Sequence, residues 1–256
     1  MTARDPVDFD VLPPGLAAAW GVVASAGRRG PKPAHSVDEV IAAATALADE
    51  RGLVAVSLPN VASAIGLSTN ALYRYIGSKD ELLMLLADRA WGDPPALPAN
   101  DWRTAASAWA HALFDRLLAR PWLLDVPTTV PLTPHNAAWL NALIAALQPT
   151  GMPAQQLLDC AYLLDSHSRY GAGLRRSAPL PASLRRENPG RLAAERAVRA
   201  FLGGQLRSRR LDALADTIDS TEFLADEAPL EGFEFGLARI IDGIDAHVRR
   251  QDGQAS

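Results

Sequence analysis

Residues 57–79, SLPNVASAIGLSTNALYRYIGSK, contain two short helical patterns on either side of a turn that includes a glycine. The turn, Ile65–Ser68, joins two helices in the manner of a helix-turn-helix. The second pattern, residues 69–75, places small polar, aromatic and basic side chains on one short helix. A helix of this kind enters the major groove of DNA. The segment therefore predicts sequence-specific DNA binding.

The size and composition of the chain limit its class. With 256 residues, of which 48% are hydrophobic, the chain can form one large or two unequal domains with a sizeable core. No run of about 18 apolar residues predicts a membrane span, and the N-terminus is acidic where a secretion signal is basic and then apolar. The single cysteine, Cys160, excludes an intrachain disulfide and a multi-cysteine zinc site. We expect a soluble cytoplasmic protein that binds no membrane.

The net charge of −4 is unusual for a DNA-binding protein, so its distribution matters. Basic residues gather without acidic ones in residues 27–36 and 51–79. Few phosphates would be neutralised there, so we expect a moderate, salt-sensitive affinity. Further along, an arginine-rich block, residues 169–210, precedes an acidic one. Blocks of opposite sign predict helices that pair; the alternative is an anionic ligand or nucleic acid on the arginines.

Capping residues mark where the first helix begins. Ser36 and Glu39 form a capping box, in which each side chain accepts a hydrogen bond from the other's amide. The helix that follows ends near Gly52. Its buried face is predicted to consist of Val37, Val40, Ile41, Ala44, Leu47 and Ala48.

Three further helices are predicted in the same region. Ser57 caps the second helix, and Ser68 caps the third. A second capping box, Ser78 with Glu81, precedes a long fourth helix that reaches Trp91.

A proline-rich segment, residues 93–100, interrupts the helical pattern, which then resumes. Asn100 is expected to cap a helix that ends before Pro121, and Thr133 caps another with Pro134 in its first turn. Residues 121–134 contain four prolines and are expected to be irregular. A short helix is expected within residues 15–25, and later helices at 153–176, 190–206, 211–220 and 229–250. No useful period-2 strand pattern is present, so the fold class is all-α.

Residues 36–91 resemble the tetracycline-repressor (TetR) family of transcriptional regulators. The resemblance rests on ALADERGL and on VASAIGLSTNALYRYIGSKDELL, of which LYRYIGSKDEL is the most specific part. RPWLLDVP and FEFGLARIIDGIDAHV resemble the C-terminal ligand and dimerisation domain of the tetracycline-repressor subgroup, and the leader resembles an arm found before the domain in many members. The resemblance implies an all-α homodimer on a palindromic operator, released when a small molecule enters the C-terminal domain.

The resemblance also divides the chain into parts. Residues 1–35 form an N-terminal extension with a basic arm, residues 36–92 the DNA-binding domain, residues 93–250 the ligand-binding and dimerisation domain, and residues 251–256 a tail. The fourth helix joins the two domains and is the natural lever between them.

Side chains that can reach bases or phosphates gather around the third helix. Thr69 and Asn70 open the helix, and by resemblance Lys79 contacts a phosphate. Leu58-Pro59-Asn60 stands where family members usually carry basic residues, for which an arm entering the minor groove would compensate; the alternative is a leader that contacts nothing. The candidate DNA-binding residues are Arg28, Arg29, Lys32, Ser57, Ser68, Thr69, Asn70, Tyr73, Arg74, Tyr75 and Lys79.

The family places its ligand between the helices of residues 100–176. Aromatic walls with a few polar groups suit an amphipathic organic molecule, although the same aromatic residues also suit an ordinary core. The candidates are Trp109, His111, Phe114, Trp139, Tyr162, Asp165, His167, Arg169 and Tyr170. We expect no metal and no cofactor, because the histidines have no partners at ligand spacing.

The last helix is apolar over more than one face, so part of it is predicted to meet a second copy. The dimer candidates are Phe233, Phe235, Leu237, Ile240, Ile241, Ile244 and Val248, with Gly236 and Gly243 permitting close approach and residues 192–206 as a second interface helix. Two alternatives to a ligand-responsive repressor are a sequestering or interaction protein with weakened DNA binding, and an all-α enzyme, for which no nucleophile–base motif is present.

Overall fold

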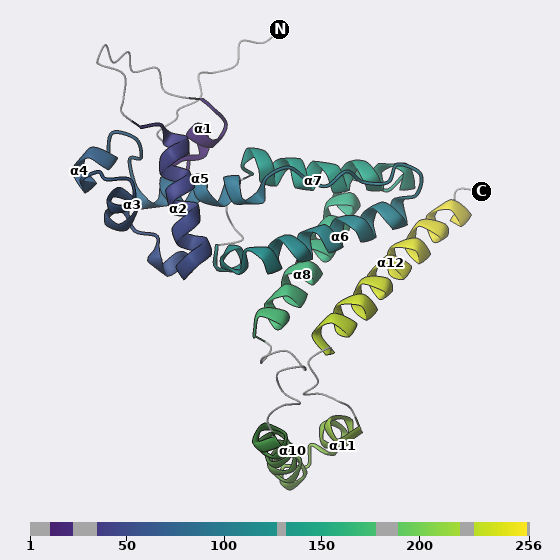
Figure 1. Ribbon diagram of the computed structural model, residues 1–256. Coiled ribbons are helices and arrows are strands. Elements are labelled where there is room, and N and C mark those ends of the chain that lie inside the picture. The colour runs from purple at the N-terminus through teal and green to yellow at the C-terminus, as the bar shows by residue number, and fades with distance from the viewer. Residues whose placement is uncertain (1–10, 23–34, 127–131, 178–188, 221–227, 255–256) are drawn as a thin grey trace. The chain divides into compact units, whose positions relative to one another are not determined.

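The computed structural model describes residues 11–22, 35–126, 132–177, 189–220 and 228–254, and these residues form helices and connecting turns with no strand among them (Figure 1). The predicted all-α class is confirmed. The chain divides into two compact units, Met1–Asp165 and Ser166–Ser256, which are described separately. None of the helices in these ranges has the length and apolarity that a membrane crossing requires.

The first predicted helix, α2 (Val37–Arg51), begins with the capping box that its sequence indicates. The Ser36 hydroxyl accepts a hydrogen bond from the Glu39 amide at 3.1 Å, and the Glu39 carboxylate accepts one from the Ser36 amide at 3.3 Å. Five of the six predicted residues are buried, but Val37 is 43% exposed. As the first residue of the helix, Val37 precedes the stripe that faces the core.

Helices α3 (Leu58–Ala64) and α4 (Thr69–Leu72) form the predicted helix-turn-helix. The Ser57 hydroxyl accepts from the Asn60 amide at 3.3 Å, and the Ser68 hydroxyl accepts from the Ala71 amide at 3.2 Å, so both predicted caps are confirmed. Between them, Gly66 has a φ of +71°, which glycine adopts readily.

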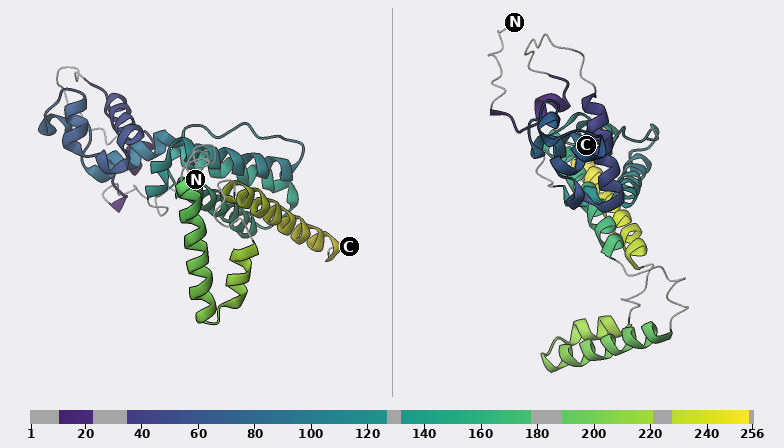
Figure 2. Two further views of the ribbon diagram at one scale, coloured as in Figure 1. Left: turned by 60° about the horizontal axis from the view of Figure 1, so that its bottom comes forward. Right: turned by 60° about the vertical axis from the view of Figure 1, so that its left-hand side comes forward.

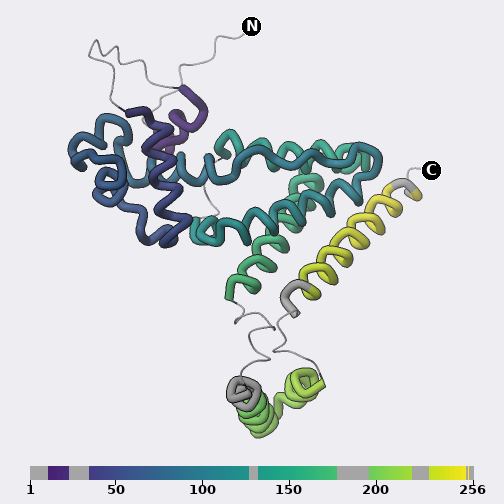
Figure 3. Tube along the Cα trace, in the orientation of Figure 1, coloured from purple at the N-terminus to yellow at the C-terminus, as the bar shows by residue number. Residues whose placement is uncertain are grey.

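The lever helix, α5 (Lys79–Trp91), has a different cap from the predicted box. The Ser78 hydroxyl accepts from the Glu81 amide at 3.1 Å, but the Glu81 carboxylate accepts from the Gly77 amide at 2.7 Å instead of the Ser78 amide. A Cβ on Gly77 would lie 3.0 Å from that carboxylate, so the absence of a side chain leaves room for the bond. Figure 3 follows the trace of α2 past α5, against which it packs.

The rest of the first unit comprises the short turns α1 (Leu16–Ala19), η2 (Leu53–Ala55), η3 (Pro121–Asp125) and η4 (Gln148–Thr150), and the helices α6 (Trp102–Ala119), α7 (Pro134–Leu147) and the start of α8 (Ala154–Ser177). Two predicted caps are wrong here. Asp101, not Asn100, caps α6, because its carboxylate reaches the amides of Arg103 and Thr104. Thr133 makes no side-chain cap bond to α7.

The Asp101 carboxylate also accepts a hydrogen bond from the Thr104 hydroxyl at 2.6 Å. This bond, followed by the one from the Thr104 amide, lowers the pKa of Asp101, so the cap remains anionic. An anion at the start of α6 is favoured by the helix dipole. The predicted irregular segment also changes in its first half, because residues 121–125 form the 3-10 turn η3.

In the second unit, α10 (Pro189–Ser208) and α11 (Asp212–Ser220) lie side by side as a hairpin (Figure 2). Arg207 of α10 bonds to Asp216 at 3.1 Å and to Asp219 at 2.7 Å. The predicted pairing of basic and acidic blocks is therefore confirmed for these three residues. The long helix α12 (Ala228–Gln254) follows.

Helices α8 and α12 approach closely at Gly236. The His167 ring of α8 stacks on Phe233 with centroids 5.2 Å apart, and its Nε2 lies 2.8 Å from the Phe233 carbonyl oxygen. A Cβ on Gly236 would lie only 2.3 Å from His167 Cε1. The predicted close approach at Gly236 is thus made to α8 of the same chain, whereas Gly243 has no atom within 4 Å of such a Cβ.

The substitution Gly236→Ala is expected to destabilise the protein by about 2 kcal/mol, because the ring of His167 is held on two sides and cannot move away cheaply. Gly243→Ala, in the same helix, should stabilise it by about 1 kcal/mol, because glycine is the poorer helix former. Urea unfolding at a fixed protein concentration measures both. Adding His167→Ala should recover much of the Gly236→Ala loss; equal stability of the two single variants would contradict the packing.

Candidate functional site

The exposed face of the helix-turn-helix carries the side chains predicted to meet DNA. Leu72 and Ile76 are fully buried beneath it, so Asn70, Tyr73 and Arg74 project outward from the opposite face of the α4 turn. Tyr73 is 52% exposed. Figure 1 shows α4 at the edge of the first unit, beyond α3. The arrangement presents an amide, a phenol and a guanidinium together.

Two cations of this surface are not neutralised by the protein. Arg74 and Lys79 are both exposed, and neither forms an ion pair within the described part of the chain. Lys79 is the first residue of α5, where free backbone amides also favour an anion. The surface can therefore bind phosphate groups on either side of the recognition helix.

The serines and Tyr75 have structural duties at the same surface. The hydroxyls of Ser57 and Ser68 accept their cap bonds, which leaves each hydroxyl proton available to a phosphate. The Tyr75 hydroxyl accepts a hydrogen bond from the His35 amide at 3.3 Å, and the two rings meet edge to face. Tyr75 therefore fixes the chain just before α2. Thr69 is half-buried at the start of α4.

The unusual triplet Leu58-Pro59-Asn60 has a structural explanation. Leu58 is buried, Pro59 occupies the first turn of α3, and the Asn60 side-chain amide donates to the Ala55 carbonyl at 2.9 Å. All three residues therefore shape the start of α3 and supply no charge for phosphate. The arm candidates Arg28, Arg29 and Lys32 lie outside the described residues.

The predicted ligand-binding tryptophans form part of a core. The Trp109 indole N–H donates to the Trp139 carbonyl at 2.9 Å, and the Trp139 indole N–H donates to the Gly92 carbonyl at 3.0 Å. Both side chains are 3% exposed, and Trp91 packs against Trp139 with ring centroids 6.0 Å apart. Their polar groups are already satisfied within the protein, as is typical of buried indoles.

The other ligand candidates lie in different surroundings. Phe114 is buried, and His111 Nδ1 lies 2.7 Å from the Ser107 carbonyl oxygen. Tyr162 and Tyr170 are more than half exposed. The candidates are divided between the two units: Trp109, His111, Phe114, Trp139, Tyr162 and Asp165 belong to the first, and His167, Arg169 and Tyr170 to the second.

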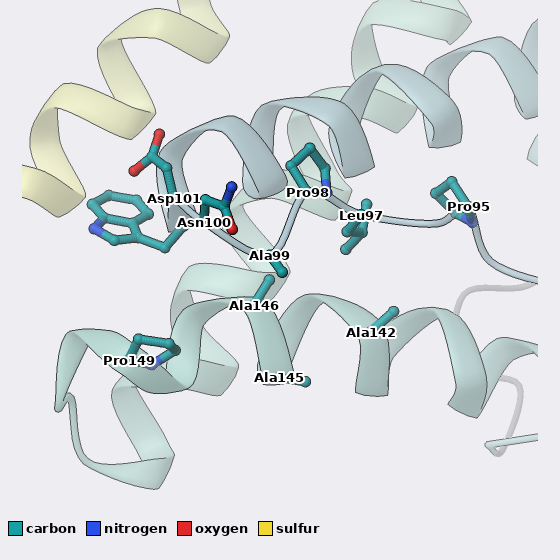
Figure 4. Close-up of a pocket in the computed structure, with 11 residues that line it drawn as sticks. Pro95, Leu97, Pro98, Ala99, Asn100, Asp101, Ala142, Ala145, Ala146 and Pro149 are labelled. Atoms are coloured by element: carbon teal, nitrogen blue, oxygen red, sulfur yellow. The ribbon is translucent and has the colours of Figure 1, made fainter.

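A hollow of about 510 Å³ lies between α7 and the segment before α6 (Figure 4). Alanines of α7 form one side, while prolines of the connecting segment and Trp102 form the other. None of the predicted ligand residues lines it, and the sequence indicated only a domain boundary here. Its lining residues are Pro95, Leu97, Pro98, Ala99, Asn100, Asp101, Trp102, Ala142, Ala145, Ala146 and Pro149.

Asp88 joins the lever helix α5 to the first turn of α7. Its side chain is only 9% exposed; one oxygen accepts from the His135 amide at 2.9 Å, and the other lies 2.8 Å from His135 Nδ1. Asp88 thus provides the cap that Thr133 does not. The sequence carried no signal for this contact, because the two residues are 47 positions apart.

Two arginines of α6 hold the carbonyl end of α5. Arg116 and Arg120 each donate to the Ala90 carbonyl at 3.2 Å, where cations are favoured by the helix dipole. Burial, and then the neighbouring Arg120, lower the pKa of Arg116. Together with Asp88, these bonds fasten α5 to both α6 and α7.

Asp49 connects α2 to the same region. Its carboxylate accepts from the Trp122 indole at 2.7 Å and lies 3.4 Å from Arg120 Nε. Arg120 and Trp122 belong to the RPWLLDVP motif, which therefore contacts the DNA-binding helices directly. In the described residues, no group of three or more histidine, cysteine, aspartate or glutamate side chains could hold a metal ion.

Some predicted dimer residues are already covered in the single chain. Phe233, Leu237 and Ile244 are at most 5% exposed, so they pack internally and are not available to a second copy. Phe233 stacks on His167, as described above. Ile240, Ile241 and Val248 are half-buried, and Phe235 is 66% exposed.

Family models match both parts of the chain. One, described as bacterial regulatory proteins, tetR family, matches residues 40–85, and another, described as tetracyclin repressor-like, C-terminal domain, matches residues 94–248. The HTH-type transcriptional repressor DrrR1 of Streptomyces coeruleorubidus is 32% identical, over 89% of this chain and 84% of that protein. An HTH-type transcriptional regulator of Saccharopolyspora erythraea is 26% identical, over 84% and 86%.

Solved structures share the fold. Apo ActR from Streptomyces coelicolor matches with a TM-score of 0.65 and 23% identity, covering 89% of this chain and all of that one. ActR in complex with actinorhodin matches with a TM-score of 0.64 and 24% identity, covering 86% and 99%.

Replacing Asp88 with alanine is expected to reduce the free energy of unfolding by about 2 kcal/mol, because the His135 amide and ring lose their acceptor. Asp159→Ala, an exposed carboxylate on α8, is the matched control and should change stability by less than about 0.5 kcal/mol. Urea unfolding measures both. If the two variants lose equal stability, the Asp88 contact does not fasten α5 to α7.

Proposed function

This chain belongs to the tetR family of bacterial regulatory proteins and is a helix-turn-helix transcriptional regulator, and we propose that it represses transcription as a homodimer on a palindromic operator. A small amphipathic molecule that enters the C-terminal domain releases it. The observation that carries the proposal is the exposed row Asn70, Tyr73, Arg74 above the buried Leu72 and Ile76. Residues 36–92 form the DNA-binding domain, and residues 93–250 bind the effector and the second copy.

Each exposed group of this surface has a role in the proposal. Asn70 reads a base edge, because an amide can pair with adenine through two hydrogen bonds. Tyr73, Arg74 and Lys79 hold phosphates or bases, with the hydroxyls of Ser57 and Ser68 as additional donors. Thr69 contacts the major groove beside Asn70. Tyr75 contributes mainly by holding residue 35 in place.

The same surface predicts how tightly DNA is held. The triplet before residue 61 supplies no cation, so phosphate contacts from α3 are few. Affinity therefore depends on a small number of charges and falls with salt in proportion to them. The arginines at positions 28 and 29 and Lys32 would add minor-groove or phosphate contacts.

Release by an effector requires coupling between two sites. Helix α5 carries Lys79 at one end, while its other end is bonded to α6 and α7 through Ala90 and Asp88. A ligand that shifts α6 or α7 therefore moves α5 as well. The two recognition helices then no longer match major grooves about 34–36 Å apart.

The effector is proposed to be an amphipathic organic molecule with an aromatic part. The relative ActR has been crystallised in complex with actinorhodin and with (S)-DNPA, and TetR from Acinetobacter baumannii in complex with minocycline. In this chain the aromatic residues from Trp109 to Tyr170 remain the proposed walls. The hollow at Trp102 is a second place where such a molecule can rest.

A second copy is proposed to bind an apolar stripe on α8. Leu163, Tyr170 and Leu174 are spaced to share one face of the helix and are 54%, 67% and 41% exposed. On α12, Phe235 is also exposed, and Ile240, Ile241 and Val248 are half-buried. These residues replace the fully buried ones in the predicted interface.

The second candidate function is a small-molecule sequestering protein with weakened DNA binding, which the uncharged start of α3 favours. No catalytic role is proposed. Burial, and then Asp159, raise the pKa of the Cys160 thiol, which keeps it protonated and a poor nucleophile.

A double substitution, Tyr73→Ala with Lys79→Ala, is expected to weaken binding to the protein's own upstream intergenic DNA by about tenfold or more. The salt dependence should fall by about one phosphate contact. Gel shifts over a range of salt concentrations measure both. Arg103→Ala, which removes an exposed cation from α6, is the control and should bind as the wild type does. If the wild type retains neither this fragment nor neighbouring promoters, the sequestering function is favoured.

The dimer surface is tested by Tyr170→Arg, which places a charge on the α8 stripe. The variant is expected to sediment as a monomer at concentrations where the wild type is a dimer, because an unpaired buried charge opposes association. Val54→Arg, at a residue that is 94% exposed in η2, is the control. A dimeric Tyr170→Arg protein would exclude this face of α8.

A further inference from the structure

The N-terminal leader is seated tightly on the start of the lever helix. Gly15, just before α1, has a φ of +87°, and a Cβ there would lie 3.0 Å from Glu81 Cα and 3.2 Å from the Glu81 carbonyl oxygen. Both neighbours are backbone atoms of α5 and cannot move aside. Only glycine therefore fits this position, through its conformation and through its size.

The same short segment is fastened at a second point. The Trp20 indole N–H donates to the Leu132 carbonyl at 3.0 Å. Leu132 directly precedes Thr133 and the first turn of α7, where His135 meets Asp88. The leader thus contacts both the beginning of α5 and the loop that leads into α7.

The residue beneath Gly15 shapes the DNA-facing loop. The Glu81 carboxylate accepts from the Gly77 amide at 2.7 Å, and the Glu81 amide donates to the Ser78 hydroxyl at 3.1 Å. Both bonds hold the two residues that precede Lys79. Pressure on the Glu81 backbone from Gly15 is therefore transmitted to the loop that positions the Lys79 ammonium.

We infer that residues 11–22 act as a strap, tying the loop before α7 to the start of α5, and that this strap positions the Gly77–Lys79 loop for DNA. This inference rests on the proposed function, because it assigns Lys79 to the operator. Without the strap, α5 is fastened only through its later residues, Asp88 and Ala90. The loop at its beginning is then ordered by the Glu81 bonds alone, and ordering it on binding DNA costs affinity.

The two glycines of the segment provide a matched test. Gly15 and Gly21 both have a positive φ, +87° and +68°, but a Cβ on Gly21 would have no atom within 4 Å. Gly15→Ala therefore combines backbone strain with a clash against Glu81, whereas Gly21→Ala has the strain alone. Trp20→Phe removes the bond to Leu132 and retains a ring.

Hydrogen exchange of the full-length protein is the first measurement. Gly15→Ala should accelerate exchange of the amides of Gly77, Glu81 and Leu82 by about tenfold relative to the wild type, and Trp20→Phe should accelerate it in the same direction. Gly21→Ala should leave these amides unchanged. Equal exchange in Gly15→Ala and Gly21→Ala would overturn the strap.

Binding to the upstream intergenic DNA is the second measurement. Gly15→Ala should bind about tenfold more weakly than Gly21→Ala. If exchange rises but affinity does not change, the segment is a strap without a role in positioning Lys79, and the inference is overturned in that part. If the wild type binds no DNA, the proposed function fails, while the exchange comparison still decides whether the strap exists.

Discussion

The carboxylate of Asp88 holds together the two ends of this regulator. A buried anion needs hydrogen-bond donors, and Asp88 finds both in one residue, since His135 offers its backbone amide and its ring. The first turn of α7 is thereby completed by a side chain from α5. Two arginines of α6 complete the opposite, carbonyl end of α5. A helix whose flank and terminus are both satisfied by its neighbours moves with them as one body.

This mechanical continuity explains how a small recognition element is held. Helix α4 comprises only four residues and would not be stable alone. Its Ser68 cap, the turn at Gly66 and the buried Leu72 and Ile76 fix its position. The outward groups are then presented without any contribution to packing, so the DNA-facing surface can change while the support beneath it stays constant.

The sequence was most informative where structure is local. The caps at Ser36, Ser57 and Ser68 depend on residues three positions apart, and all three form as predicted. Contacts across long separations were not predictable. The partner of Asp49 is 73 positions away in Trp122, and nothing in the spacing of either residue indicates that they meet. The boxes and caps that failed, at Glu81 and Asn100, failed because a neighbouring amide or carboxylate was equally close in sequence.

Burial presents a similar limit for the functional residues. The pattern of residues 233–248 showed that α12 is apolar on more than one face, but only the packed structure distinguishes Phe233, which rests on His167, from the exposed Phe235. The tryptophans pose the same problem, because an aromatic wall and a core have one composition. Their indole bonds to Trp139 and Gly92 are visible only in three dimensions.

The way α5 is fastened also gives its connecting segment an unusual freedom. Because the bonds to Ala90 and Asp88 fix the register of α5 against α6 and α7, residues 93–100 need not set the distance between them. The closure cost of a surface segment rises only slowly with its length. The chain between Asp93 and Pro98 is therefore a suitable place to insert a reporter peptide, which would leave the recognition surface and its lever in register.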